Sequence, residues 1–388
     1  MTILIDGTSL INKGAEMMAL AVIQEIEKNY PDATVLYQDW FYLAKKNYFN
    51  TKLNIKYVNK KNLFYFFVKR FHIQGILNKL HIPCTLIKMR KFFSGVDVLL
   101  DAGGFQFGDN WNLSLKDVKE RYEYYRKYYE AGTKLIFLPQ SFGEMQSESS
   151  QIIIKALNNF ASRVYPRDIE SYENLKKGGI KKMMEIFPDF TALVNQQSNS
   201  QFIIKENTVA IIPNHKMTDM TSLDEEGYIS FITQLINYLR ENKFNPILVN
   251  HEGIRDKKIC ELIGSKIPGT EVYGDLSVIE LKQLLSLCYG VISSRFHGVA
   301  NSLNSGTPCI STSWNVKYEN LFKDYQLTDM VISKCEINAD TKRVLQHVLD
   351  KNENEFLRKK LIDSKKNICD KNRLMWNEIY RVMKNDIN

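Results

Sequence analysis

The stretch that decides the fold reads Val291-Ile-Ser-Ser-Arg-Phe-His-Gly-Val-Ala-Asn-Ser-Leu-Asn-Ser-Gly-Thr-Pro-Cys-Ile310. Its apolar start predicts a buried strand, and residues 296–303 carry helical spacing after a Ser-Arg turn. Gly306 is placed to end the helix, and Pro308 to begin the next strand. A strand–turn–helix–strand unit of this kind is typical of a parallel α/β sheet.

The turn between this strand and this helix carries groups suited to an anion. Ser293 or Ser294 is expected to cap the helix, whose first N–H groups favour negative charge. Arg295 adds a permanently charged bidentate donor, and His297 exchanges a proton near neutral pH. The alternative is a surface arginine and a core histidine. Because α/β sheets bind ligands at the carboxyl ends of their strands, we favour a site for phosphate or carboxylate.

Strand-like and helix-like segments alternate along the rest of the chain, and a polar stretch at 195–207 interrupts the series. The 388 residues exceed one ordinary core. We therefore expect an α/β protein with two Rossmann-like, doubly wound domains, over 1–195 and 205–335, that face a cleft. C-terminal helices over 336–388 are expected to pack back on the N-terminal domain.

Composition indicates a soluble globular protein, with 44% hydrophobic and 25% charged residues. Met1 is followed directly by a short strand-like run, which does not resemble a secretory signal. No stretch reaches the ~20 apolar residues that span a bilayer. The six cysteines form no C-x-x-C pair. This pattern argues against a zinc or redox motif and favours buried thiols in a reducing cytoplasm.

Residues 40–96 hold the whole positive excess of a chain whose formal charge is +8. They contain twelve Lys/Arg and no acidic residue, whereas the rest of the chain has 40 basic against 44 acidic residues. The segment is also rich in aromatic residues. It could be a solvated face, a nucleic-acid binder or a surface that lies on an anionic membrane. No recognisable nucleic-acid module accompanies it.

Five sequence blocks stand in order along the chain. They are Asn12-Lys13-Gly14-Ala15-Glu16, Asp101-Ala102-Gly103-Gly104-Phe105, Leu138-Pro139-Gln140-Ser141-Phe142-Gly143, Arg167-Asp168 with Ser171, and Ser294-Arg295-Phe296-His297-Gly298 followed by Gly306-Thr307-Pro308 and Lys317. Taken in order, these blocks resemble the motifs of the polysaccharide pyruvyl transferase family, and the last block resembles its C-terminal signature. The resemblance covers roughly residues 1–325. It departs from the usual pattern at Lys13 and in the basic segment 40–96.

The resemblance implies a GT-B-like fold and an enzyme that uses phosphoenolpyruvate. Pyruvyl would pass to two hydroxyls of a hexose, such as galactose, as a cyclic ketal, with release of phosphate. The implied acceptor is a bacterial surface polysaccharide or its lipid-linked precursor. A lipid-linked acceptor favours peripheral contact of 40–96 with the inner face of the cytoplasmic membrane. Phosphoenolpyruvate is a co-substrate, and neither a cofactor, a metal nor nucleic acid is expected. A nucleotide-sugar glycosyltransferase and a non-catalytic glycan-binding relative stay open.

Carried over residue by residue, the donor contacts of the family fall on Arg167, Arg295 and His297, with Ser294 and Lys317 as further candidates. Fixed cations suit a ligand with both carboxylate and phosphate, and ketal formation needs proton transfer, so His297 and Arg295 are the catalytic candidates. Polar groups of the N-terminal domain are the acceptor candidates: Asn12, Lys13, Glu16, Asp109 and Gln140. The alternative for Glu16 is a first-turn acid that complements the helix dipole. Asp168 is interpreted as a helix cap, and His215 and His251 as polar lining.

Overall fold

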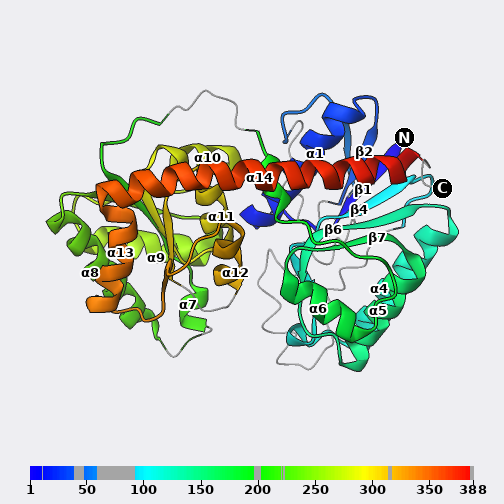
Figure 1. Cartoon of the computed structure of the whole chain (residues 1–388), viewed down its shortest axis with the longest axis horizontal. Coiled ribbons are helices and arrows are strands. Elements are labelled where there is room, and N and C mark those ends of the chain that lie inside the picture. Colours follow the sequence, from blue (N-terminus) through cyan, green and yellow to red (C-terminus); the bar gives the residue numbers. More distant parts are fainter. Residues whose placement is uncertain are drawn as a thin grey trace, which may run out of the picture. The chain divides into compact units, whose positions relative to one another are not determined.

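In a computed structural model, the chain forms two compact units (Figure 1). The first comprises residues 1–10, 25–186 and 381–388, and the second comprises residues 11–24 and 187–380. The structure describes residues 1–10, 12–38, 48–58, 92–195, 202–219, 221, 223–312 and 317–384. Most of the basic segment 40–96 therefore lies outside the described residues.

The first unit is built on a parallel sheet with the strand order β3-β2-β1-β4-β6, on which β5 and β7 both pair with β6. Its strands are β1 (Thr2–Asp6), β2 (Thr34–Tyr37), β3 (Asn54–Tyr57), β4 (Val98–Asp101), β5 (Phe105–Phe107), β6 (Lys134–Phe142) and β7 (Ala161–Pro166). The order reverses between β1 and β4, which pair with Asp6 opposite Asp101. A doubly wound sheet binds its ligands beside such a reversal.

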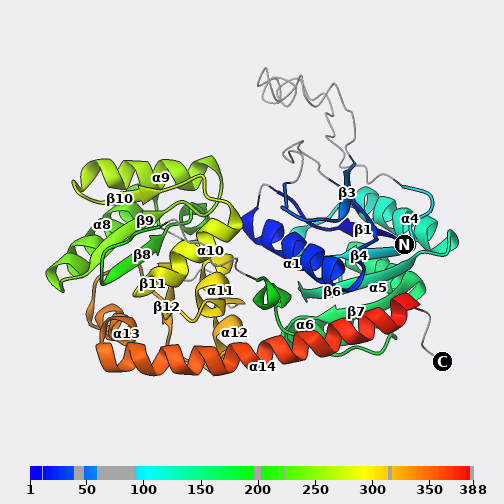
Figure 2. The same ribbon diagram turned by 90° about the horizontal axis from the view of Figure 1, so that it is seen from above.

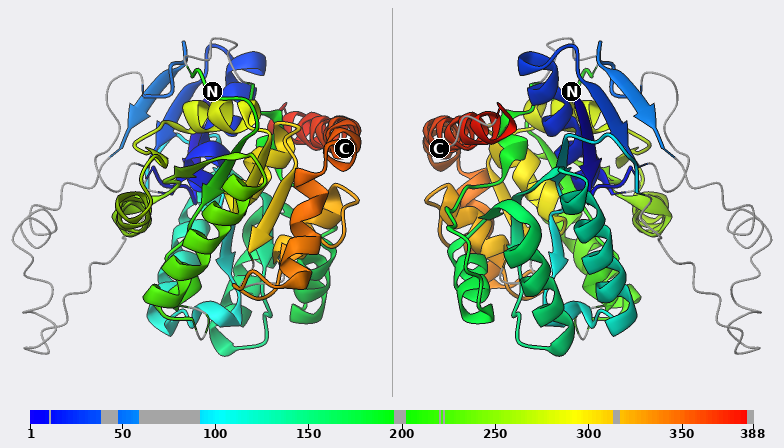
Figure 3. Two further views of the ribbon diagram at one scale, coloured as in Figure 1. Left: turned by 90° about the vertical axis from the view of Figure 1, so that its left-hand side faces the viewer. Right: turned by 90° about the vertical axis from the view of Figure 1, so that its right-hand side faces the viewer.

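Helices α4 (Leu115–Glu130) and α5 (Glu148–Phe160) lie side by side along one face of this sheet (Figure 3). They bury Tyr125, Tyr128 and Leu157 against Leu99 and Leu135. The remaining elements of the unit are α6 (Ile169–Gly178) and the short 3-10 helix η1 (Asp109–Trp111). Ser114 caps α4, because its side chain accepts from the N–H of Asp117.

The second unit has a parallel sheet in the order β10-β9-β8-β11-β12-β13. Its strands are β8 (Thr208–Ile212), β9 (Asn245–Val249), β10 (Glu271–Tyr273), β11 (Gly290–Ser293), β12 (Cys309–Thr312) and β13 (Val331–Ile332). In chain order this is the 3-2-1-4-5-6 arrangement of a Rossmann sheet. The predicted pair of doubly wound α/β domains with C-terminal helices is thereby confirmed.

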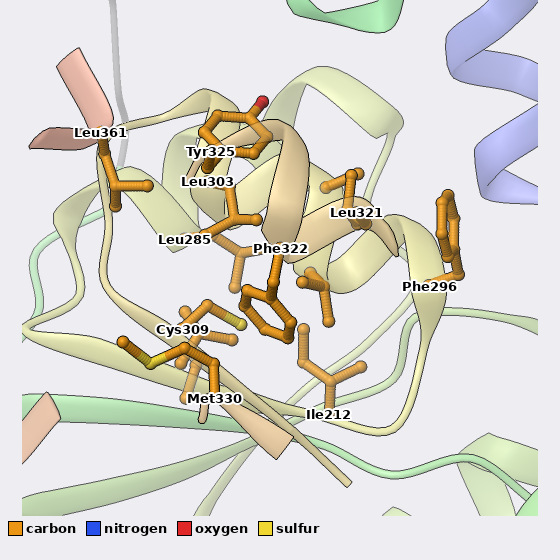
Figure 4. Packing of buried hydrophobic residues seen from close by; sticks show 14 of the residues in the cluster. Ile212, Leu285, Phe296, Leu303, Cys309, Leu321, Phe322, Tyr325, Met330 and Leu361 are labelled. Atoms are coloured by element: carbon orange, nitrogen blue, oxygen red, sulfur yellow. The ribbon is translucent and has the colours of Figure 1, made fainter. Parts of the chain in front are cut away.

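Helices cover both faces of the second sheet, because alternate strand residues are apolar on each side. One face packs against α8 (Glu225–Glu241), α9 (Gly253–Lys266) and α13 (Ala339–Leu349). The other packs against α10 (Val278–Leu287), α11 (Phe296–Asn304), α12 (Lys317–Asp324) and α14 (Lys351–Lys384). Figure 2 shows this layering, and Figure 4 shows Leu303 and Phe322 in the second layer. The unit also contains α7 (Lys216–Asp219) and the 3-10 helix η2 (Phe190–Leu193).

Two assignments differ from the division expected from the sequence. Residues 11–24, with most of α1 (Lys13–Asn29), group with the second unit although β1 and β2 belong to the first. The C-terminal helices were expected on the N-terminal domain, but residues up to 380 group with the second unit. Leu357 and Leu361 of α14 enter its core, which explains the grouping. The last turn of α14 groups with the first unit, where Lys134 Nζ donates to Val382 O at 2.6 Å.

A fully buried lysine lies in the second unit. Lys282 of α10 is 0% exposed, and its Nζ donates to Val194 O at 3.0 Å. Burial, followed by the positive charge of Lys365, lowers the pKa of Lys282 to about 7. Above this pH the folded protein holds a neutral amine, whereas the unfolded chain stays protonated up to its ordinary pKa of about 10.5. The unfolded state then binds more protons, so this residue makes stability rise with pH between about 7 and 10.

We expect the substitution Lys282→Met to abolish that rise. Between pH 7 and 9, the unfolding free energy of the unsubstituted protein should gain roughly 2 kcal/mol relative to the variant. Urea denaturation of both proteins over this range measures the difference, and the comparison cancels other titrating groups. Parallel pH profiles would show that Lys282 keeps its ordinary proton affinity when folded.

Candidate functional site

The carboxyl ends of β8 and β11 lie next to each other where the strand order reverses. Asn214 follows β8, and Ser294 and Arg295 follow β11. The two turns are joined, because Asn214 Nδ2 donates to Ser294 O at 2.8 Å. Helix α8, which comes after the short α7, and helix α11 pack on opposite faces of the sheet. The predicted anion-binding turn therefore stands at the ligand-binding position of a Rossmann sheet.

Arg295 is held by two carboxylates of the same unit. Its Nη1 lies 2.6 Å from Glu252 Oε2, and its Nη2 lies 2.6 Å from Asp256 Oδ2. Its Nε also donates to Asp256 Oδ2 at 2.7 Å. Only 11% of the arginine side chain is exposed, and Asp256 is fully buried. The positive charge is thus already matched by negative charge, and the guanidinium is fixed in orientation before any ligand arrives.

The first turn of α11 differs in one detail from the prediction of a serine cap. Arg295 occupies the cap position and makes no side-chain cap hydrogen bond, so the prediction of Ser293 or Ser294 was wrong. Ser293 Oγ instead accepts from the N–H of Arg295 at 3.0 Å. Without a side-chain cap, the first N–H groups of α11 keep the positive end of the helix dipole.

Ser294 connects neighbouring strands through its side chain and backbone. Its hydroxyl contacts Tyr228 OH at 2.7 Å and also the hydroxyl of Thr312. Its carbonyl accepts from Tyr318 OH at 2.8 Å. Since Ser294 is only 2% exposed, these contacts hold the turn in place. A donor contact by Ser294 stays a prediction.

His297 lies directly against the first turn of α1. A methyl group placed on Gly14 would lie 1.9 Å from Nδ1 and 2.2 Å from Cε1 of His297. The imidazole of His297 also meets the ring of Phe296 edge-on, with the ring centroids 5.2 Å apart. The absence of a side chain at Gly14 therefore allows this position of the imidazole.

Three predicted acceptor residues, Asn12, Lys13 and Glu16, belong to this same unit. Asn12 Oδ1 accepts from the N–H of Gly14 at 2.9 Å, so it caps α1. Its Nδ2 donates to Glu252 Oε1 at 3.0 Å, which links α1 to the partner of Arg295. Lys13 Nζ pairs with Glu16 Oε2 at 2.9 Å. The structure thus brings these residues to Arg295 and His297.

Sequence reasoning gave the residues that follow β9 no role beyond the polar lining assigned to His251. His251 is 2% exposed, and neither of its ring nitrogens has a hydrogen-bond partner within the described part of the chain. Burial raises the pKa of Glu252, although Arg295 opposes the effect. His215 Nδ1 lies 2.8 Å from Asp256 Oδ1. The sequence pattern that could have indicated these residues is the polar pair His251-Glu252 at a strand end, with Asp256 one helical turn later.

The strand reversal in the first unit forms a second polar cluster around Asp101. This buried carboxylate accepts from Gln106 Nε2 at 2.5 Å and from Tyr125 OH at 3.1 Å. The predicted acceptor residue Gln140 is 0% exposed, and its Nε2 lies 3.4 Å from Asp101 Oδ1. Arg121 Nη1 donates to Gln106 Oε1 at 3.0 Å. The cluster offers amide and guanidinium groups, which are suited to sugar hydroxyls.

Arg167, the predicted donor contact from the first unit, follows β7. It is 6% exposed, and its Nη2 donates to Ser141 Oγ at 2.6 Å. The next residue, Asp168, caps α6 by accepting from the N–H of Ser171 at 2.7 Å, as predicted. Arg167 therefore lies in a different unit from Arg295 and His297.

Asp109, a predicted acceptor residue, is bound to the start of α5. Its carboxylate accepts from Ser147 Oγ at 2.6 Å and from the N–H of Gln146 at 2.9 Å. Partial burial raises the pKa of Asp109, but the hydrogen bonds from Ser147, Ser150 and Gln146 outweigh it and hold the pKa below its ordinary value. These contacts give Asp109 a structural role, and its role in binding the acceptor stays a prediction. The side chain of Lys317 lies outside the described residues.

The family of this chain is shown by a comparison with known protein families. Residues 12–316 match the family described as "Polysaccharide pyruvyl transferase". The chain belongs to the polysaccharide pyruvyl transferase family. The match spans well over half of the chain, including Gly14, Arg167, Arg295 and His297. This family is a family of enzymes, so the resemblance drawn from the ordered motifs is confirmed.

Solved structures share the fold of this pyruvyl transferase family member. The S. aureus MnaA–UDP co-structure has a TM-score of 0.60 at 9% identity and covers 99% of this chain and 97% of its own. UDP-GlcNAc 2-epimerase from Neisseria meningitidis, bound to UDP-GlcNAc, has a TM-score of 0.58 at 10% identity. The match covers 98% of this chain and 100% of the epimerase chain. A glycosyltransferase from Rickettsia africae reaches 0.53 at 14% identity, with 98% of each chain covered. At such low identities, the structural likeness shows the GT-B-like fold alone.

Two further findings concern curated proteins and membrane-spanning helices. No curated protein matches the chain. Among the helices that the structure describes, none has the length and hydrophobicity that crossing a membrane requires.

The ion pairs of Arg295 lead to a stability prediction for this pyruvyl transferase. Arg295→Met leaves Glu252 and Asp256 without their counter-ion and should cost roughly 3–5 kcal/mol of unfolding free energy. Arg255 is the matched control, because it also pairs with a carboxylate, at 2.8 Å from Asp219 Oδ1, but on the exposed surface. Arg255→Met should leave the urea midpoint nearly unchanged. Equal effects of the two substitutions would contradict a buried, charge-balanced role for Arg295.

Proposed function

We propose that this protein transfers the pyruvyl group of phosphoenolpyruvate to two hydroxyls of a hexose, such as galactose. The product is a cyclic pyruvate ketal on a bacterial surface polysaccharide or its lipid-linked precursor, and phosphate is released. The family match over residues 12–316 carries the proposal. The position of Arg295 and His297 at the reversal of a Rossmann sheet supports it, because this is where such sheets bind phosphate-bearing ligands.

The reaction has a definite proton balance. The methylene carbon of phosphoenolpyruvate gains one proton and becomes a methyl group, while C2 forms bonds to two sugar oxygens and loses its bond to phosphate. One sugar hydroxyl proton balances the methyl group, and the other leaves with phosphate. A group that both gives and takes protons is therefore required, and His297 is the residue we assign to it.

The donor site is assigned to the β11–α11 turn. The first N–H groups of α11 are suited to bind an anion. Arg295 is fixed beside them by Glu252 and Asp256. We assign Arg167, Ser294 and Lys317 to the donor as further contacts. The assigned acceptor residues are Asn12, Lys13, Glu16, Asp109 and Gln140.

A single incubation tests this function. Purified protein is mixed with phosphoenolpyruvate and a panel of lipid-linked sugars, and phosphate release is followed together with the masses of the sugars. We expect phosphate release that depends on the acceptor, and a product heavier by one pyruvate ketal. If activity instead required a nucleotide sugar and released a nucleotide, the chain would be a glycosyltransferase. Binding of the sugars without turnover would make it a glycan-binding relative.

We also propose that residues 40–96 contact an anionic membrane, where a lipid-linked acceptor would be found. Twelve Lys/Arg without any acidic residue support this proposal. The protein should sediment with vesicles that contain phosphatidylglycerol at low salt and leave them at high salt, because the Debye length falls to about 3 Å at 1 M. Binding that is indifferent to salt, or absent at low salt, would contradict the proposal.

A further inference from the structure

The basic side chains at the β11–α11 turn bring no surplus of positive charge. Lys13 pairs with Glu16 at 2.9 Å, while Arg295 pairs with Glu252 and Asp256, both at 2.6 Å. Two cations thus face three carboxylates. Phosphoenolpyruvate carries a phosphate and a carboxylate, so its binding here needs positive charge that these pairs do not supply. The three histidines at this edge of the sheet are groups that could gain it.

The three histidines differ in what already surrounds them. His215 Nδ1 lies 2.8 Å from Asp256 Oδ1, so this ring has a carboxylate partner. His297 contacts both Gly14 and the ring of Phe296. His251 is 2% exposed, and both of its nitrogens lack a hydrogen-bond partner among the residues described here. A buried imidazole with two unused nitrogens is costly, unless something absent from the free protein occupies them.

The charged groups around His251 explain how such a ring is tolerated. It is approached by Lys13 from α1, and by Arg295 and His297 from the β11–α11 turn, while the carboxylates of Glu16, Glu252 and Asp256 pair with the first two of these. Burial first, and then the charges of Arg295, His297 and Lys13, hold the pKa of His251 well below its ordinary value. The ring is therefore neutral in the free protein at pH 7. An anion that binds beside Arg295 and Lys13 would oppose this effect and favour a proton on the ring.

We propose that His251 takes up a proton when the donor binds, and that the resulting imidazolium donates hydrogen bonds to the phosphate or carboxylate of the donor. This inference rests on the proposed function, and it adds a donor-binding residue to that function. The proton comes from the solvent and returns to it when the products leave, so the stoichiometry of ketal formation is unchanged. Donor binding then becomes tighter as the pH falls toward neutrality.

Proton uptake can be measured without turnover. Calorimetric titrations with phosphoenolpyruvate, and separately with inorganic phosphate, are run at pH 7.5 in two buffers of different ionisation enthalpy. The difference in heat gives the number of protons bound. We expect uptake approaching one proton in the unsubstituted protein and little in His251→Gln, which keeps a hydrogen-bonding side chain of similar length. At pH 7 the variant should bind phosphoenolpyruvate roughly tenfold more weakly than the unsubstituted protein. At high pH the difference in affinity between the two proteins should be smaller.

His215→Gln and His297→Gln serve as matched controls, and both should retain the uptake. A second measurement covers the case in which His251→Gln fails to fold. In that case, the protein labelled with ¹³C-histidine should show one imidazole resonance moving from the neutral to the charged position when phosphoenolpyruvate is added. Uptake that persists in His251→Gln, uptake lost only in His297→Gln or His215→Gln, or no charged resonance would overturn the inference and leave the proposed function intact. If the protein bound neither phosphoenolpyruvate nor phosphate, both would fail.

Discussion

Replacing His297 with glutamine is expected to lower kcat by about two to four orders of magnitude, the range that general acid–base catalysis contributes. Glutamine keeps a polar group of similar reach but cannot exchange a proton. The affinity for phosphoenolpyruvate should fall much less, because Arg295 and the α11 N-terminus remain in place. Phosphate release measured at saturating acceptor gives kcat, and calorimetry gives the dissociation constant of the donor.

His347 provides the control for a change from histidine to glutamine as such. It lies on α13 and pairs with Glu353 at 2.7 Å, outside the site. The substitution His347→Gln should leave kcat unchanged. If His297→Gln lost donor affinity and kcat by equal factors, the ring would serve to bind the anion and not to move a proton.

The sequence predicted the unit around β11 because its signals are local. Residues 296–303 carry the apolar spacing of the helix, and α11 runs from Phe296 to Asn304. Gly306 ends it in the left-handed region, with φ of +74°. Ser277 caps α10 by accepting from the N–H of Glu280 and forms a capping box with it. Each of these features depends on neighbours within a few positions along the chain.

The surroundings of Arg295 could not be predicted in the same way. Its partners Glu252 and Asp256 lie about forty residues earlier, and only the pairing of β8 with β9 and β11 brings them to it. Arg295 was therefore interpreted as a cation available to a ligand, whereas the structure shows it already matched by two carboxylates. The same distance in sequence hid the role of His251, which had been interpreted as polar lining.

The grouping of α1 is a further case of tertiary contacts that override sequence order. Sequence reasoning placed Asn12, Lys13 and Glu16 in the N-terminal domain because they follow its first strand. The hydrogen bond from Asn12 to Glu252 and the packing of Gly14 on His297 place this turn with the second unit. The predicted cleft between the domains, and the predicted role of segment 40–96, stay predictions.

The substitution Gly14→Ala is expected to lower kcat about a hundredfold or more, because a displacement of the catalytic group by about 1 Å has that effect. The added methyl would overlap His297 Nδ1 at 1.9 Å, so either the imidazole or the first turn of α1 must move. Gly274→Ala is the control in the same unit, since its methyl would lie 3.8 Å from Asn250 Cβ, an ordinary contact. That variant should keep kcat and stability.

Removing the ring tests whether His297 is the cause. By overpacking, Gly14→Ala should cost about 1–3 kcal/mol of unfolding free energy in the unsubstituted protein. In a His297→Ala background the methyl meets no imidazole, and alanine is favoured over glycine in a helix, so the cost should vanish or turn into a small gain. Urea denaturation of the four proteins completes this double-mutant cycle independently of activity. Costs that add in full would mean that Gly14 and His297 act separately, and the position of His297 would then not depend on the absence of a side chain in α1.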